Sequence, residues 1–313
     1  MCSFEVHAPP RLRLRLPNLR AWLGPAAGSE DMELYRRSFS KRIETGSPAR
    51  LRVENRNGRI SVRTHGEPVI VIDVQAEVYA ANAAEADAVM RRIEQAITVE
   101  GNSVTVLTPE LPRPEWSFFG RGSKVDYEIR VPAETEVRAG NRNGQVEVRN
   151  VRGAVYVEER NGNVVVEEVA GDVQVESRNG RVRIVRAGGG VRVVVRNGPV
   201  SIEDPAGAVD VETTNGGVEV AGAGASVRIS SVNGGVRVNG AVRGDVEVTS
   251  VNGGVRLAVP RGSRFEIDAE SRHGGVHSEL PVRDQAPAPE AGRPPVVRLR
   301  TMHGGIRITE LQP

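Results

Sequence analysis

Valine and isoleucine alternate with polar residues over most of this chain. In pairs such as Val146/Val148, Val173/Val175 and Val209/Val211, a single Glu, Gln or Asp separates two apolar side chains. A period of two is typical of β-strands that bury one face and expose the other. The pattern therefore predicts an all-β protein made of many short strands.

An Asn-Gly pair recurs with a period of 18 residues. Asn57-Gly58 is an early copy, and His273-Gly274 and His303-Gly304 take the same place after longer gaps. Asn-Gly also favours hairpin turns, but a meander of hairpins would drift in strand length. The fixed period instead predicts a right-handed β-solenoid with 18-residue coils and two short sheets per coil. The stacked asparagines would be Asn143, Asn161, Asn179, Asn197, Asn215, Asn233 and Asn252.

The alternation continues into the turn. If Val173 and Val175 point inward, then Ser177 and Asn179 do so as well, whereas Arg178 points outward. We expect the stacked asparagines to form hydrogen bonds between coils, which satisfies amides that would be costly to bury. This asparagine ladder is thus expected to be structural.

Residues 83–97 carry the one convincing helical pattern. Asn82 is expected to cap its N-terminus with Glu85 three residues on, and Val89 and Ile93 lie on its apolar stripe. We expect this helix to cover the open end of the solenoid, where bare strand edges would promote aggregation.

The repeat also defines the domain organisation. Residues 1–35 lack it and are expected to form a poorly ordered arm or a cap, whereas residues 36–313 form the solenoid domain. Residues 281–295, rich in Pro and Ala, are expected to be a loop inserted before the last coil.

Composition supports a thin core. Aromatic residues make up 4% of the 313 residues, too few for the thick core of a common α/β enzyme. The net charge of +2 gives no global attraction to nucleic acid or membrane, and the single cysteine excludes an intramolecular disulfide. No apolar run is long enough for a transmembrane helix, and the chain starts without a signal-peptide core, so we expect it to stay in the cytoplasm.

Several segments in this order resemble one known family. They are residues 55–62, the helix that follows, residues 125–132, the Val-Asn-Gly-Gly-Val repeats and residues 300–308. Together they resemble the bacterial putative-adhesin family of β-strand-repeat proteins, a domain-of-unknown-function family, over residues 36–313. The resemblance implies a right-handed β-solenoid without enzymatic activity, exported or membrane-tethered in the cell envelope and in some members linked to envelope stress.

Arginines form the most distinctive charge pattern. Six lie between Ser177 and Ile202 without an acidic residue among them, and four share one outward column about 5 Å apart. Such a column would suit the phosphates or carboxylates of an envelope polymer. The alternative is that Glu158, Glu159 and Glu176 screen it. The candidate polyanion-binding residues are Arg142, Arg160, Arg178, Arg181, Arg183, Arg192 and Arg196.

The sequence contains no recurring pattern of metal ligands. The glycine-rich repeat lacks the recurring Asp of calcium-binding β-rolls, so no calcium ladder is expected. His273, His277 and His303 could converge on a metal, although the simpler interpretation is that His replaces Asn in the ladder. No cofactor is therefore predicted.

One aromatic cluster stands outside the repeat. Trp116, Phe118 and Phe119 lie within four residues and could anchor a partner or a lipid surface. The alternative is that they pack under a cap, against the stripe of Val89 and Ile93.

These features favour a protein that is not an enzyme. No nucleophile or phosphate-loop motif is present, and no aromatic residues are interleaved with the arginines for nucleic-acid stacking. The leading hypothesis is an adhesin-like structural solenoid in the bacterial envelope that binds an anionic polymer or a protein partner. The alternative is a cytoplasmic scaffold that self-associates end to end through an uncapped C-terminal coil. An enzyme acting on a surface polysaccharide is a distant third.

Overall fold

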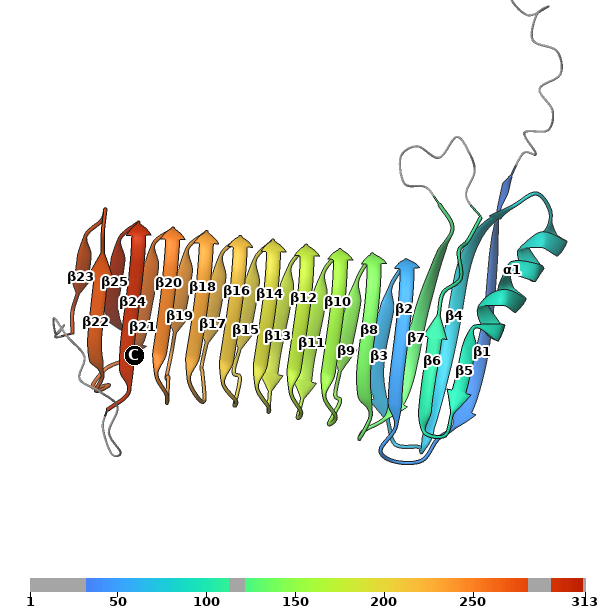
Figure 1. Ribbon diagram of the computed structural model, residues 1–313. Helices are drawn as coiled ribbons and strands as arrows, with labels where there is room; N and C mark the ends of the chain where they lie inside the picture. The colour runs from blue at the N-terminus through green and yellow to red at the C-terminus, as the bar shows by residue number, and fades with distance from the viewer. Residues whose placement is uncertain (1–31, 113–121, 281–293, 312–313) are drawn as a thin grey trace, which may run out of the picture.

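The computed structural model describes residues 32–112, 122–280 and 294–311. Two long sheets stack face to face, and the chain passes repeatedly from one to the other (Figure 1). We call each pair of successive strands, one in each sheet, a coil. The all-β prediction is confirmed, with one helix, α1 (Ala83–Gln95), in the described residues.

The first sheet has 13 strands. They are β1 (Glu33–Glu44), β3 (Ile60–His65), β4 (Val69–Ala80), β7 (Lys124–Pro132), β9 (Val146–Arg149), β11 (Val164–Val169), β13 (Val182–Ala187), β15 (Val200–Glu203), β17 (Val218–Ala221), β19 (Val236–Asn239), β21 (Val255–Pro260), β23 (Val276–Ser278) and β25 (Ile306–Leu311).

The second sheet has 12 strands. They are β2 (Arg50–Asn57), β5 (Ile97–Glu100), β6 (Ser103–Leu107), β8 (Glu136–Asn143), β10 (Val155–Asn161), β12 (Val173–Asn179), β14 (Val191–Asn197), β16 (Val209–Asn215), β18 (Val227–Asn233), β20 (Val246–Asn252), β22 (Glu266–Ser271) and β24 (Val296–His303).

Strands of the repeat pair in parallel and place identical positions side by side. Val155 lies opposite Val173 and Val173 lies opposite Val191, with partners 18 residues apart along the chain. Their side chains are buried between the sheets, as the alternating pattern predicts. Valine fills this narrow space because its branched side chain packs well on a pleated surface.

One aromatic ring is fully buried in the thin core. Tyr127 of β7 is 1% exposed, and its hydroxyl lies 2.8 Å from the hydroxyl of Thr108. Burial raises the pKa of Tyr127 to about 12. The ring is accommodated in the non-repeating, N-terminal part of the fold, where its polar end has a partner.

At both ends, the order of the coils in space differs from their order in the sequence. The coil β6/β7 lies outside β2/β3, so the Asn57 copy does not open the series in space. At the other end, β24/β25 is inserted between β20/β21 and β22/β23. The outermost coil at this end is therefore β22/β23 and not the last coil of the sequence, because the chain returns and places β24/β25 inside.

An antiparallel pair and the helix lie at the N-terminal end (Figure 1). Strand β1 pairs antiparallel with β4 along its whole length and begins at Glu33, within the segment expected to be an arm. Helix α1 packs on β4, β1 and β5 through Ala86, Val89, Met90 and Ile93. Asn82 caps it as predicted, but the helix ends at Gln95 and not at 97, because Ile97 begins β5.

The asparagine ladder forms, although its environment differs from the expected one. Each amide Nδ2 donates to Oδ1 of the preceding asparagine, from Asn57 to Asn252, at 2.8 to 2.9 Å. The ladder side chains are exposed or half-buried, so the expectation of buried amides was wrong. Each asparagine is the last residue of its strand, directly before the turn, where its side chain is no longer enclosed between the sheets. The last inward position is two residues earlier, as at Ser177, which is buried.

Some of the segments singled out in the sequence lie outside the described residues. These are residues 1–31 of the expected arm, residues 281–293 of the expected loop, and Trp116, Phe118 and Phe119. In the described parts of the chain, no helix has the length and apolar character needed to cross a membrane.

Candidate functional site

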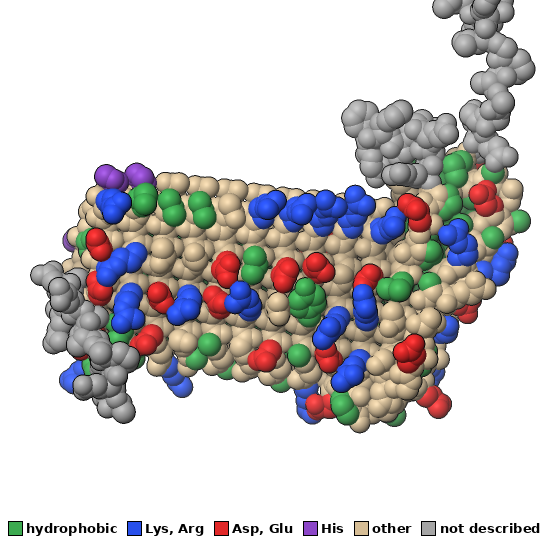
Figure 2. All heavy atoms as spheres, viewed as in Figure 1, with side chains coloured by type: hydrophobic (Ala, Val, Ile, Leu, Met, Phe, Trp, Pro, Cys, Tyr) green, Lys and Arg blue, Asp and Glu red, His purple; other side chains and the backbone are tan. Residues whose placement is uncertain are grey.

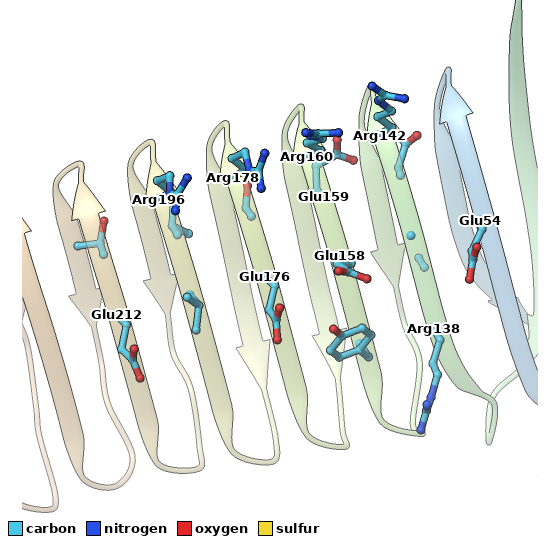
Figure 3. A pocket seen from close by; sticks show the side chains of 18 of the residues that line it. Glu54, Arg138, Arg142, Glu158, Glu159, Arg160, Glu176, Arg178, Arg196 and Glu212 are labelled. Carbon is cyan, nitrogen blue, oxygen red and sulfur yellow. The ribbon is translucent and has the colours of Figure 1, made fainter.

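Four arginines line up along one edge of the second sheet. Arg142, Arg160, Arg178 and Arg196 each precede a ladder asparagine on β8, β10, β12 and β14, and the in-register pairs on either side place them level (Figure 3). Neighbouring strands lie about 4.8 Å apart, so the four cations follow one another at that spacing. We call these four residues the arginine column.

The arginine column is unusual because its charges have no ion-pair partner among the described residues. All four side chains are exposed, and in the described parts of the chain none of them makes an ion pair or a side-chain hydrogen bond. A row of basic side chains follows this edge of the molecule in Figure 2. Like charges so close repel one another, which an anion bound along the column would relieve.

The basic segment ends abruptly. The register continues the column beyond Arg196 through Thr214, Val232, Val251 and Met302. In Figure 2 hydrophobic side chains follow the basic row along the same edge. Arg56, which precedes Arg142 in this register, is paired with Glu110 at 2.9 Å, and another exposed arginine, Arg272, follows only beyond Met302. In the described structure, adjacent unpaired arginines thus occupy four successive coils.

The other predicted arginines do not join the column. Arg183 lies on the first sheet and binds Glu203 with both terminal nitrogens, at 2.7 and 2.9 Å. Arg192 is on the second sheet but pairs with Asp210 and Glu212 at 2.5 and 3.0 Å. Arg181 is exposed at the turn after Gly180. The seven candidate arginines therefore do not share one surface, because successive strands belong to opposite sheets.

A shallow groove of about 1130 Å³ runs beside the arginine column on the same sheet. Its floor carries Glu158, Glu176 and Glu212, which form a row parallel to the arginines, together with Tyr156 (Figure 3). On β10 and β12, which carry members of both rows, the glutamate and the arginine are two residues apart, or about 7 Å. These carboxylates make the electrostatic potential of the surface less positive, but they form no ion pair with the arginines of the column.

Beneath the column, a second row of polar side chains points inward. Asn141, Glu159 and Ser177 occupy paired positions on three successive strands, and all three are buried. Each has one oxygen without a hydrogen-bond partner: Asn141 Oδ1, Glu159 Oε2 and Ser177 Oγ. We call these residues the buried polar column.

Glu159 is the exceptional member of this row. It is 3% exposed, and its Oε1 accepts a hydrogen bond from the backbone N–H of Asn161 at 3.0 Å. Burial raises its pKa from 4.5 to about 7, against the opposing effect of the nearby backbone and Asn141 hydrogen bonds. The equivalent position on the two neighbouring strands holds Asn141 and Ser177, so a buried carboxyl here departs from the repeat.

The histidines stack as the repeat predicts. The rings of His273 and His303 lie 4.9 Å apart at 16°, in the position of the ladder asparagines. His277 lies on β23 opposite Arg307. In the described ranges no three His, Cys, Asp or Glu side chains come together as metal ligands.

Two features escaped the sequence analysis. The first is a second basic column on the first sheet, where Arg237, Arg256 and Arg307 lie at matching positions of neighbouring strands. The second feature is the burial of Glu159, which the sequence analysis named only as a screening charge. The 18-residue comparison could have revealed it, because Glu159 is the one acidic residue at a position otherwise taken by Asn, Ser, Thr or Val.

Comparison with known proteins places the fold in a family. A model of the Toastrack DUF4097 family matches residues 57–309. Similar solved structures include a putative cell adhesion protein from Clostridium sporogenes, with 11% identity, 88% of this chain and 100% of that chain covered, and a TM-score of 0.26. A putative adhesin from Parabacteroides distasonis is 10% identical, with 88% of this chain and 97% of that chain covered and a TM-score of 0.34. A putative adhesin from Bacteroides fragilis is 12% identical, with 89% of this chain and 97% of that chain covered and a TM-score of 0.28. No curated protein matches the chain. Because the family model spans most of the sequence, this chain belongs to the Toastrack DUF4097 family.

Proposed function

We propose that this protein is a non-enzymatic, adhesin-like β-solenoid whose arginine column binds an anionic polymer of the bacterial envelope. The observation that carries the proposal is the set of four exposed arginines on successive strands, which have no ion-pair partner in the described part of the chain. We take the scaffold to be right-handed with 18-residue coils, in line with the spacing of the paired residues. The envelope setting follows from the family resemblance of the sequence.

The chemistry of the column favours phosphate or carboxylate ligands. Guanidinium groups donate paired hydrogen bonds to such anions, and a linear polymer can present one anion to each coil. A flat, rigid sheet also holds its side chains in place before binding, which lowers the entropic cost of forming several contacts.

The proposal predicts the effect of removing the column. The triple variant Arg160→Ser, Arg178→Ser, Arg196→Ser should bind heparin, a sulfated polyanion, at least about tenfold more weakly, since three charge contacts are lost. The affinity can be measured by biolayer interferometry at several salt concentrations. The three side chains are exposed, so the circular dichroism spectrum should stay unchanged.

The second basic column provides a matched control. Arg237→Ser, Arg256→Ser, Arg307→Ser removes the same charge from exposed positions on the other sheet. This variant should bind heparin nearly as well as the original protein. Equal weakening by both variants would contradict a specific site on the arginine column and would point to net charge alone.

The second candidate function is end-to-end self-association. It is favoured by the position of β22 and β23, which are the outermost strands of the two sheets at that end in the described structure. Strand edges template pairing with another chain. If they do so here, the sedimentation coefficient should rise with protein concentration, and Val276→Lys on β23 should prevent the rise. A constant coefficient would exclude this candidate.

A further inference from the structure

The buried polar column has too few protons when Glu159 is ionised. Asn141 Nδ2 donates to the carbonyl oxygen of Gly58 at 3.0 Å, which fixes the amide and leaves its Oδ1 in need of a donor. The hydroxyl of Ser177 and the second N–H of Asn141 Nδ2 can both turn to Glu159, but neither supplies a hydrogen to Asn141 Oδ1. Ionised Glu159 thus leaves an unsatisfied acceptor and a buried charge, and both are costly.

A proton on Glu159 completes the row. Small side-chain rotations would let Ser177 Oγ–H donate to Glu159 Oε2, while the proton on that carboxyl donates to Asn141 Oδ1. Paired positions on neighbouring strands are close enough for such contacts. The positions on either side of the row do not supply a hydrogen-bond donor to it. Asn55 already donates to the carbonyl of Val125 and accepts from Thr108, and Val195 is apolar.

The charged groups around Glu159 belong to the candidate site. Arg142 on β8, Arg160 on β10 and Arg178 on β12 surround it, and Glu158 and Glu176 lie on the outer faces of the same strands. Across the core, β9 and β11 present valines, and their charged side chains lie on the outside of the first sheet. Among the residues that the structure describes, Glu159 is therefore the one buried carboxylate that can offset the positive potential of the column from inside.

We propose that the protonation of Glu159 controls anion binding at the arginine column, so that the polyanion binds tightly when this carboxyl is neutral and weakly when it is ionised. This inference rests on the proposed function. By linkage, a bound polyanion should lower the acid dissociation constant of Glu159 by the same factor by which protonation strengthens binding, and its pKa should rise accordingly. The charge of Glu159 should change the affinity for an anion at the arginine column about three- to tenfold.

Heparin is a suitable probe because its sulfates stay ionised across the relevant pH range. We expect heparin affinity of the original protein to fall about three- to tenfold from pH 6 to pH 8, around the pKa of about 7. Glu159→Gln should remove this dependence and retain the tight binding at pH 8. The histidines are shared by both proteins, so their titration cancels in the comparison.

Glu158→Gln is the matched control. It removes a carboxylate from the same strand, but from the outer face, and should strengthen binding without changing the pH profile. A carbon-13 NMR titration of the Glu159 carboxyl, with and without heparin, provides an independent measurement and should show a higher pKa with heparin. Identical pH profiles for the original protein and Glu159→Gln would overturn the inference and leave the proposed function standing. If no protein bound heparin at any pH, both would fall.

Discussion

Gly234→Ala is expected to lower the free energy of unfolding by at least about 3 kcal/mol. Gly234 has φ +150°, a backbone conformation that residues with a Cβ rarely adopt. A Cβ at this position would lie 2.1 Å from the carbonyl oxygen and 2.6 Å from the carbonyl carbon of Gly216 in the neighbouring turn. Both atoms belong to the backbone of a stacked coil, so a side-chain rotation cannot relieve the overlap. The denaturant midpoint from circular dichroism measures the loss.

The adjacent glycine is the control for this prediction. A Cβ on Gly235 would lie 3.6 Å from the carbonyl oxygen of Gly254, which is ordinary van der Waals contact. Gly235→Ala should therefore change stability by less than about 1 kcal/mol. Similar losses for the two variants would show that the turns can separate, and the tight stacking described here would then be wrong.

The change that Glu159→Gln makes in the free energy of unfolding is expected to be about 3 kcal/mol more stabilising at pH 8 than at pH 5. The pKa of Glu159 is raised from 4.5 to about 7 in the folded state, mainly by burial. Between these values the native state holds a proton that the unfolded state has released. The stability of the original protein therefore falls as the pH rises through this window and levels off above pH 7. Glutamine does not titrate, and its amide can donate to Asn141 as the protonated carboxyl would.

Urea unfolding of both proteins between pH 4.5 and pH 8.5 tests this prediction. The difference between them should grow with pH, because the other titrating groups are common to both. Glu158→Gln should show no such growth. A constant difference between Glu159→Gln and the original protein would mean that Glu159 titrates in the native state as it does in the unfolded chain.

The repetitive part of the fold was predictable because its physics is local. Alternation such as Val173/Val175 defines the buried face, and the fixed spacing of Asn-Gly defines which residues stack. The same parity predicted that Ser177 is buried and that Arg178 is exposed. Stacking of His273 on His303 followed from the same register.

The candidate site was predictable only in part. The four arginines of the column share one position of the repeat, so their alignment could be derived from the period. Arg183 and Arg192 are close to them in sequence, but one lies on the opposite sheet and both bind carboxylates from later coils. Ion pairs of this kind join residues 18 or 20 positions apart, and their formation depends on side-chain geometry.

The sequence alone determined the strand pattern, the stacking register, the outward column of arginines and the capped helix, because each depends on residues related by a fixed spacing. The tertiary structure decided the order of the coils at both ends, where β6/β7 lies outside β2/β3 and β24/β25 lies inside β22/β23. It also decided which arginines remain unpaired and that Glu159 has an oxygen without a partner. These properties depend on which coils become neighbours and on the shared environment of several strands, and neither is encoded in any single repeat.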